Sequence, residues 1–171
     1  METPLVLVCT HAKRDTCCAV KGRPLAAELV EDYPDMVWET SHTKGHRFAP
    51  SVMLMPWGYS FGRMNKEAAA QMIAAAARGK YFYPVNRGRG IFGPRGQVAE
   101  LAVARALIDA GEELSYGQLT ATDSGEVSHI DGRRWRVTLE EREVEGVVSS
   151  CGDAPKTGQA IVATGVEPVA G

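Results

Sequence analysis

The architecture of this chain can be predicted outward from Pro4-Leu5-Val6-Leu7-Val8-Cys9. An unbroken apolar run of this kind is typical of a fully buried strand, here with Cys9 at its end. Residues 22–30 then have the pattern of a helix, with Pro24 near its first position. A short strand is predicted over residues 36–40. This order predicts two parallel strands joined by a helix.

The next segments extend this unit. Residues 51–55 and 59–64 have strand character and are separated by a Pro-Trp-Gly turn, which predicts a hairpin. Asn65 is a suitable N-cap for an alanine-rich helix over residues 66–78. The predicted order is therefore β-α-β-β-β-α, which is the arrangement of a thioredoxin-like α/β domain. We assign this domain to residues 1–82.

The second half of the chain predicts a smaller α+β region over residues 83–171. Residues 86–94 are rich in Gly, Arg and Pro and have the composition of a loop. Helical spacing returns over residues 97–110, and the remainder favours antiparallel strands. These strands are expected over residues 115–122, 126–130 and 133–139, with one more between residues 147 and 164.

Composition and charge narrow the class of protein. The chain has 171 residues, of which 44% are hydrophobic, and its formal net charge is −2. This balance is not typical of proteins that bind nucleic acid or membranes, and no apolar run approaches the roughly 20 residues that span a bilayer. The N-terminus lacks the pattern of a signal peptide. We therefore expect a cytoplasmic protein whose four cysteines include metal ligands or redox groups.

Two cysteines and two histidines are the candidate metal ligands. Cys9 ends the first strand, and Cys18 precedes the predicted helix, whose dipole favours a thiolate there. His42 and His46 follow the second strand and are expected at the same end of the sheet as Cys9. Thiolates and imidazoles suit both zinc and iron–sulfur sites. Since the spacing is too open for a zinc finger, our leading interpretation is a 2Fe–2S cluster.

Other cysteines and histidines compete with this set or lie outside it. Cys17 is adjacent to Cys18, and spacing alone does not separate the two. His11 imitates part of a Rieske motif, but no later Cys-x-x-His completes that motif. We interpret His11 as lying beside the ligands or on the surface. Cys151 and His129 are isolated in the sequence and are interpreted as structural.

The ligand segments resemble those of a known family. Residues 7–19, LVCTHAKRDTCCA, resemble the CTHxxRDxCC stretch of the sucrase/ferredoxin-like family. Residues 37–49, VWETSHTKGHRFA, resemble its SHxGGHRFA stretch, and residues 59–63 resemble its GxxYGR strand. Similar matches to the C-terminal part of the family occur at residues 88–90, 131–135 and 150–156. The resemblance thus runs along essentially the whole chain.

The resemblance implies a thioredoxin-like ferredoxin fold. It also implies a 2Fe–2S cluster held by Cys9, Cys18, His42 and His46, as in the bis-histidine fungal members, and so favours Cys18 over Cys17. Lys44 stands where the family often has glycine, which predicts a stiffer or more basic histidine loop with the same ligands. Typical members also carry a segment before the first strand, so a short form is expected here.

The function expected from these residues is one-electron transfer. Neutral imidazoles in place of thiolates raise the potential of a cluster, and a solvent-facing imidazole can couple reduction to proton uptake. The expected partner is a redox protein that donates or accepts electrons. A second copy of the chain, in a homodimer, is an alternative partner. Neither nucleic acid nor membrane is expected as a partner. Because no catalytic constellation is recognisable, we expect an electron carrier rather than an enzyme.

Three alternative interpretations are compatible with the same sequence. In the first, the same four ligands close a structural zinc site. In the second, Cys17 or Cys18 acts in a thioredoxin-like thiol enzyme, although Cys-x-x-Cys is absent. In the third, the C-terminal region binds a partner protein, with Arg87, Arg89 and Arg95 as a docking patch.

Overall fold

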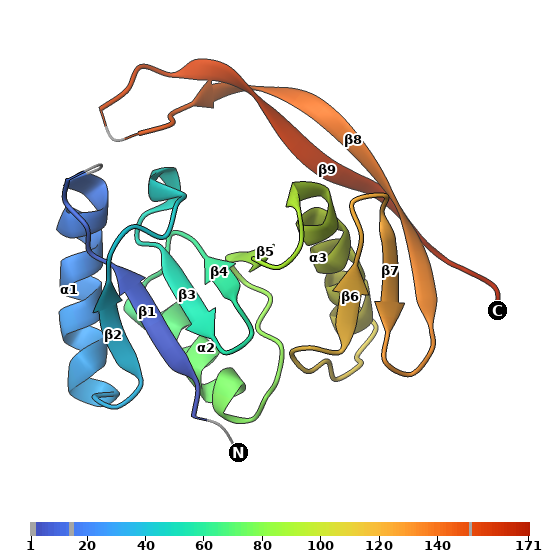
Figure 1. The fold of residues 1–171 in the computed structure, drawn as a ribbon, viewed down its shortest axis with the longest axis horizontal. Coiled ribbons are helices and arrows are strands. Elements are labelled where there is room, and N and C mark those ends of the chain that lie inside the picture. Colours follow the sequence, from blue (N-terminus) through green and yellow to red (C-terminus); the bar gives the residue numbers. More distant parts are fainter. Residues whose placement is uncertain (1–2, 14–15, 151) are drawn as a thin grey trace.

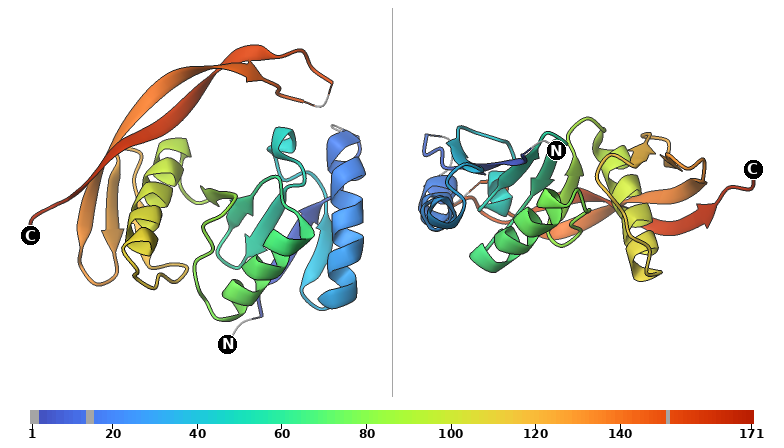
Figure 2. Two further views of the ribbon diagram at one scale, coloured as in Figure 1. Left: turned by 180° about the vertical axis from the view of Figure 1, so that it is seen from behind. Right: turned by 90° about the horizontal axis from the view of Figure 1, so that it is seen from below.

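The protein is described by a computed structural model over residues 3–13, 16–150 and 152–171, with the backbone alone at His46. Over these residues it has a five-stranded sheet and a four-stranded sheet, which lie on either side of helix α3 (Pro94–Asp109) (Figure 1). A long hairpin from the second sheet arches over the first sheet, and its tip reaches helix α1 (Thr16–Asp32) (Figure 2).

The first sheet has the strand order β2-β1-β3-β4-β5. Its strands are β1 (Leu5–Cys9), β2 (Val37–Thr40), β3 (Val52–Met55), β4 (Tyr59–Phe61) and β5 (Asn86–Arg89). Strand β1 pairs in parallel with β2 and antiparallel with β3. The parallel register places Cys9 opposite Thr40, so the cysteine and the histidine loop start at one end of the sheet.

Helices α1 and α2 (Lys66–Ala77) contact each other and pack against the first sheet (Figure 2). Asn65 caps α2, since its side chain accepts a hydrogen bond from the backbone N–H of Ala68. The helix buries residues at helical spacing, namely Ala69, Met72, Ile73 and Ala76. With α1, β1 and β2 before it and the β3–β4 hairpin between, α2 completes the predicted β-α-β-β-β-α order, which is confirmed.

The second unit combines α3 with an antiparallel sheet in the order β6-β7-β8-β9. Its strands are β6 (Leu119–Ala121), β7 (Glu126–His129), β8 (Arg134–Val147) and β9 (Lys156–Pro168). Strands β8 and β9 run far beyond the other two and form the arching hairpin, which we call the arm (Figure 1). In the part of the chain that the structure describes, no helix is long and apolar enough to cross a membrane.

The first helix is longer than the sequence pattern predicts. It begins at Thr16 rather than at residue 22, so Cys17 and Cys18 lie in its first turn and Pro24 lies inside it. Because proline is favoured at the start of a helix, the sequence pattern predicts a start close to Pro24, which is too late. At position 24 it has no N–H to donate to the carbonyl of Val20, a loss that the packing of α1 against the sheet offsets.

Three further expectations are wrong. Residues 86–89, predicted as loop, form the edge strand β5, because pairing with β4 outweighs the poor strand propensity of glycine. Strand β1 is not buried on both faces: Val6 and Val8 are inaccessible, whereas Leu5 is 40% exposed. Strand β8 also continues past residue 139 into the arm. The division at residues 82 and 83 stays a prediction, although β5 adds later residues to the first sheet.

A buried carboxyl group lies where the two units meet. Glu100 of α3 is fully inaccessible, and it accepts a hydrogen bond from the hydroxyl of Tyr59 in β4. The Tyr59 ring packs against Tyr81 and Tyr116, with centroid separations of 5.3 and 4.9 Å. Burial raises the pKa of Glu100 to about 7, although the hydrogen bond from Tyr59 and the charge of Arg89 oppose this shift. The carboxyl group is therefore protonated in the folded protein at mildly acidic pH.

This raised pKa predicts that stability falls as the pH rises. Between pH 4.5 and about 7 the unfolded chain loses the Glu100 proton while the folded chain keeps it. The unfolding free energy should fall by about 3 kcal/mol across this window, because one pKa unit is worth about 1.4 kcal/mol. Urea unfolding at pH 5 and pH 8 measures this difference. Glu100→Gln should remove the difference in unfolding free energy between the two pH values, whereas Glu143→Gln on the exposed arm should leave it unchanged. An equal pH-dependent difference in the two variants would contradict an origin at Glu100.

Candidate metal centre

Cys9 and Cys18 come together at the end of β1. Cys9 is 1% and Cys18 2% exposed, and both are thiols. With Ala49 they form a small buried cluster that is separate from the main core of the protein. The backbone at Cys9 is fixed on both sides, since its N–H donates to Ser51 and the next N–H donates to Thr40. The structure therefore places two predicted ligands in one buried cluster.

The geometry of α1 explains why Cys18 rather than Cys17 points inward. Cys18, Gly22, Leu25 and Leu29 follow the spacing of one helix face, and all four are buried. Cys17 lies outside this row, is half-buried, and its sulfur is in a disulfide. In this state Cys18 is the thiol that shares a pocket with Cys9. The assignment of Cys18 as a ligand stays a prediction.

A glycine sets the distance between helix and strand. A β-carbon at Gly22 would lie 2.1 Å from the carbonyl oxygen of Cys9, well inside a van der Waals contact. The helix can approach the end of β1 only because this position has no side chain. Cys18 lies one turn earlier on the same face, so the same contact positions its sulfur.

The histidine loop follows β2 directly. Lys44 and Gly45 both have left-handed backbones, with φ of 61° and 84°. This conformation is natural for glycine and strained for lysine. Lys44, which stands where the family often has glycine, therefore stores local strain. After this turn the short 3-10 helix η1 (His46–Phe48) contacts α1. The Thr43 hydroxyl lies 3.3 Å from that of Ser51 and ties the loop to the start of β3.

His42 lies beside His11. Their ring centroids are 6.5 Å apart, with the planes tilted by 52°. Both residues are half-buried, so each imidazole has access to solvent. His11, which the sequence places next to the ligands or on the surface, is thus a neighbour of a predicted ligand. The His46 side chain is outside the described part of the structure, so the prediction that it is a ligand cannot be compared with it.

The described side chains do not form a complete ligand set. Among them, no three His, Cys, Asp or Glu residues lie close enough to bind one metal ion. Cys151 is outside the described residues. His129 lies in the second sheet, where its Nδ1 accepts a hydrogen bond from the backbone N–H of Asp131.

Three arginines surround the aromatic ring at the end of η1. The guanidinium carbons of Arg87, Arg47 and Arg63 lie 4.0, 4.6 and 5.8 Å from the centroid of the Phe48 ring. Burial, and then the charge of Arg47, lower the pKa of Arg87. Sequence reasoning missed Arg47 and Arg63, although both lie in segments that resemble the family motifs. These arginines place positive charge next to the histidine loop.

The three arginines of the predicted patch, Arg87, Arg89 and Arg95, make different contacts. Arg87 packs on Phe48, while the Nε of Arg89 donates to the carbonyl of Trp57. The Nε of Arg95 donates to the carbonyl of Asp123 in the second unit. Each arginine therefore contacts a different part of the protein.

The β-α-β-β-β-α unit, with its parallel β1–β2 pair and its antiparallel hairpin, defines a thioredoxin-like α/β domain. The sequence profile described as Sucrase/ferredoxin-like matches residues 1–88, and the chain belongs to this family. The comparison with curated proteins gives no match.

Solved structures of low sequence identity are also similar. A thioredoxin-like [2Fe-2S] ferredoxin from Aquifex aeolicus is 16% identical, with 53% of this chain and 94% of that chain covered and a TM-score of 0.43. Two cysteine-to-serine variants of the same ferredoxin are 17% identical, with TM-scores of 0.38 and 0.36. For each variant the match covers 44% of this chain and 88% of that chain.

The close contact at Gly22 predicts the effect of adding one methyl group. In an exposed helix, alanine is favoured over glycine by about 1 kcal/mol, so a gain in stability would be the ordinary result. Here Gly22→Ala should lose about 2 kcal/mol or more, because α1 must move away from Cys9. Chemical unfolding measures the loss, and reaction with a thiol reagent should become faster as Cys9 and Cys18 open to solvent.

The matched control is Lys21→Ala, which changes the exposed neighbour on the same helix turn. This variant should keep the stability and the slow thiol reaction of the unmodified protein. A Gly22→Ala protein as stable as this control would mean that the helix tolerates a wider separation from β1.

Proposed function

We propose that this protein is a one-electron carrier that holds a 2Fe–2S cluster through Cys9, Cys18, His42 and His46. The observation that carries the proposal is the buried pair of thiols at the end of β1, apart from the main core. A redox partner protein that donates or accepts the electron is part of the proposal. Membership of the sucrase/ferredoxin-like family supports it.

The chemistry of the thiol pair favours a metal-bound state. Two thiolates so close together and so deeply buried would be costly, because each charge loses its hydration and repels the other. A bound cation or cluster removes this cost and keeps both sulfurs ionised. Cys18 lies in the first turn of α1, where the positive end of the helix dipole favours a thiolate. The two buried sulfurs therefore fit a metal group that binds thiolates.

The histidines would give such a site its distinctive properties. When bound, a 2Fe–2S cluster supplies a centre that stores and releases one electron. Two neutral imidazoles leave this site with less negative charge than four cysteines would, which favours the reduced state. The half-buried ring of His42 can hold a proton on its second nitrogen, and the neighbouring His11 ring provides an exchange partner near the surface. A potential that depends on pH follows from this arrangement.

The first test is the cofactor content of protein purified without oxygen. A reddish protein with about two irons and two sulfides per chain is expected, since a 2Fe–2S cluster has that composition. Cys9→Ser and Cys18→Ser should lose colour and iron. Cys17→Ser is the matched control and should keep both. A colourless protein with one zinc would replace the electron carrier by a structural zinc site.

The second test addresses the histidines in the loaded protein. His42→Cys and His46→Cys should each keep the cluster and lower its midpoint potential by on the order of 100 mV or more, because a thiolate adds negative charge. The pH dependence of the potential should weaken in the same variants. Spectroelectrochemical titration at several pH values measures both effects. A histidine whose replacement changes neither the spectrum nor the potential is not a ligand.

A further inference from the structure

The three arginines around Phe48 are built into the fold. They come from η1, from the residue after Gly62 and from β5, so they are far apart in the sequence. A β-carbon at Gly45 would lie 2.4 Å from a terminal nitrogen of Arg87, and one at Gly62 would lie 2.9 Å from its Cδ. Two glycines thus make room for the side chain of Arg87, whose guanidinium group packs on the Phe48 ring.

The positive charge of this cluster is not balanced. Within the described residues, none of the three arginines forms an ion pair, whereas four other arginines do, namely Arg105, Arg133, Arg136 and Arg142. Like charges gathered around one ring repel each other, and Arg87 is half-buried and therefore poorly screened. The arrangement lacks an anion.

A cavity with room for an anion lies beside the cluster. It has a volume of about 340 Å³ and is lined on one side by Arg47, Phe48 and Arg63. The other side is formed by the arm, at residues 144–148 together with Gln159 and Ala160. Glu145 is the single acidic residue among the described lining residues, so the cavity keeps an excess of positive charge. The arm converts an exposed patch into a partly enclosed site.

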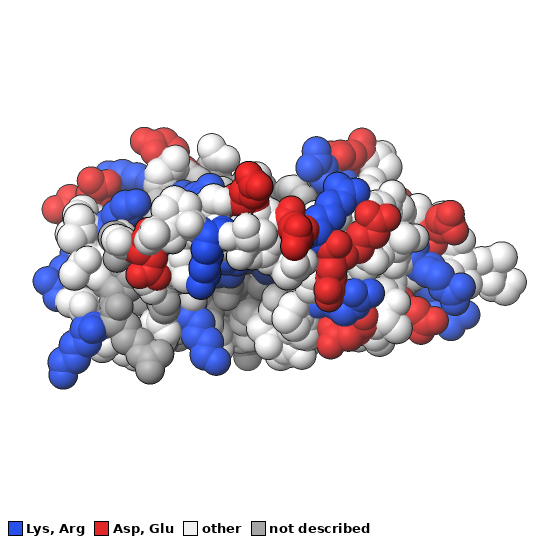
Figure 3. Space-filling model, turned by 90° about the horizontal axis from the view of Figure 1, so that it is seen from above, with Lys and Arg blue, Asp and Glu red and all other residues white. Residues whose placement is uncertain are grey.

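The size of the positive region favours a small ligand over an acidic protein. Figure 3, which views the molecule from the arm side, shows acidic and basic side chains interspersed over this face rather than a broad field of one sign. A docking surface for an acidic macromolecule would need a wider positive area.

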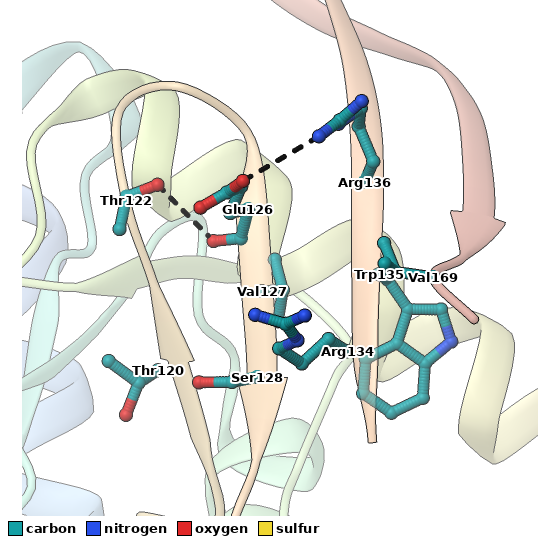
Figure 4. Close-up of a pocket in the computed structure, with 9 residues that line it drawn as sticks. All are labelled: Thr120, Thr122, Glu126, Val127, Ser128, Arg134, Trp135, Arg136 and Val169. Atoms are coloured by element: carbon teal, nitrogen blue, oxygen red, sulfur yellow. Dashed lines mark hydrogen bonds and ion pairs between the residues drawn. The ribbon is translucent and has the colours of Figure 1, made fainter. Parts of the chain in front are cut away.

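A pocket on the second sheet provides a contrast (Figure 4). It has a similar volume of about 270 Å³ and also contains arginine side chains. There, however, Arg136 lies 3.7 Å from the carboxylate of Glu126 and is balanced by it. The Figure 4 pocket is a useful comparison, since it has the same residue types but one of its two arginines is paired with its glutamate.

We propose that Arg47 and Arg63 form a binding site for a phosphate group, on inorganic phosphate or on a small phosphorylated molecule, beneath the arm, with Arg87 adding positive charge at the same Phe48 ring. A guanidinium group donates two parallel hydrogen bonds to phosphate oxygens, and the two guanidinium groups that line the cavity match the double negative charge of a phosphate ion. The cavity is larger than a phosphate ion needs, which leaves space for an organic part between Phe48 and the arm. This site does not depend on the proposed cluster.

The test is a titration of the purified protein with inorganic phosphate at constant ionic strength, with chloride as the reference salt. Calorimetry should show saturable binding of one phosphate per chain, and phosphate should raise the melting temperature more than chloride does. Arg47→Gln and Arg63→Gln change exposed side chains and should each weaken binding about tenfold or more, because a charged hydrogen bond is lost. Arg136→Gln, in the Figure 4 pocket, should bind as the unmodified protein does.

Two outcomes would overturn the proposal. One is phosphate binding no stronger than chloride binding at equal ionic strength. The other is equal weakening in the Arg47, Arg63 and Arg136 variants, which would indicate a general surface effect. Binding is expected in colourless and in reddish preparations alike, so the fate of the proposed cluster and the fate of this site are read separately.

Discussion

The contact between Gly22 and the carbonyl of Cys9 is the constraint on which the proposed metal centre depends. This contact brings α1 close to β1. The residue one turn before Gly22 on the same face of the helix must therefore lie at the end of the strand. Cys18 occupies that face, and its sulfur joins Cys9 in a buried cluster. A larger residue at position 22 would separate the two thiols. The pairing of the cysteines is therefore a consequence of backbone packing rather than of the loop that joins them.

The parallel pairing of β1 and β2 supplies the second half of the arrangement. In a parallel pair the carboxyl ends of both strands lie at the same edge of the sheet, and here Cys9 is opposite Thr40. The chain that leaves β2 must therefore begin its loop beside the cysteine pocket. The left-handed turn at Lys44 and Gly45 then directs η1 back toward α1. Sheet topology and two unusual backbone conformations together place the histidine loop.

Much of the first unit could be predicted from its sequence because its signals are local. Apolar runs, the Asn65 cap and the turn after residue 55 fix the element order. The errors have a common origin in tertiary contacts. Pro24 lies inside a helix that the sheet supports, β5 forms because β4 offers it a partner, and Leu5 is exposed on the sheet face that the helices do not cover. None of these contacts leaves a local pattern, since each depends on residues distant in the chain.

The same reason explains why the arginine cluster was not predicted. Arg47, Arg63 and Arg87 are separated by long intervals of sequence, and only the sheet order β3-β4-β5 brings their backbones together near η1. The arm adds residues from still later in the chain, because α3 holds the second sheet beside the first. Its length then allows its tip to reach the histidine loop. The C-terminal unit thus contributes, through the arm, to the surroundings of the proposed metal centre, and any anion bound beneath the arm would connect the two units by charge.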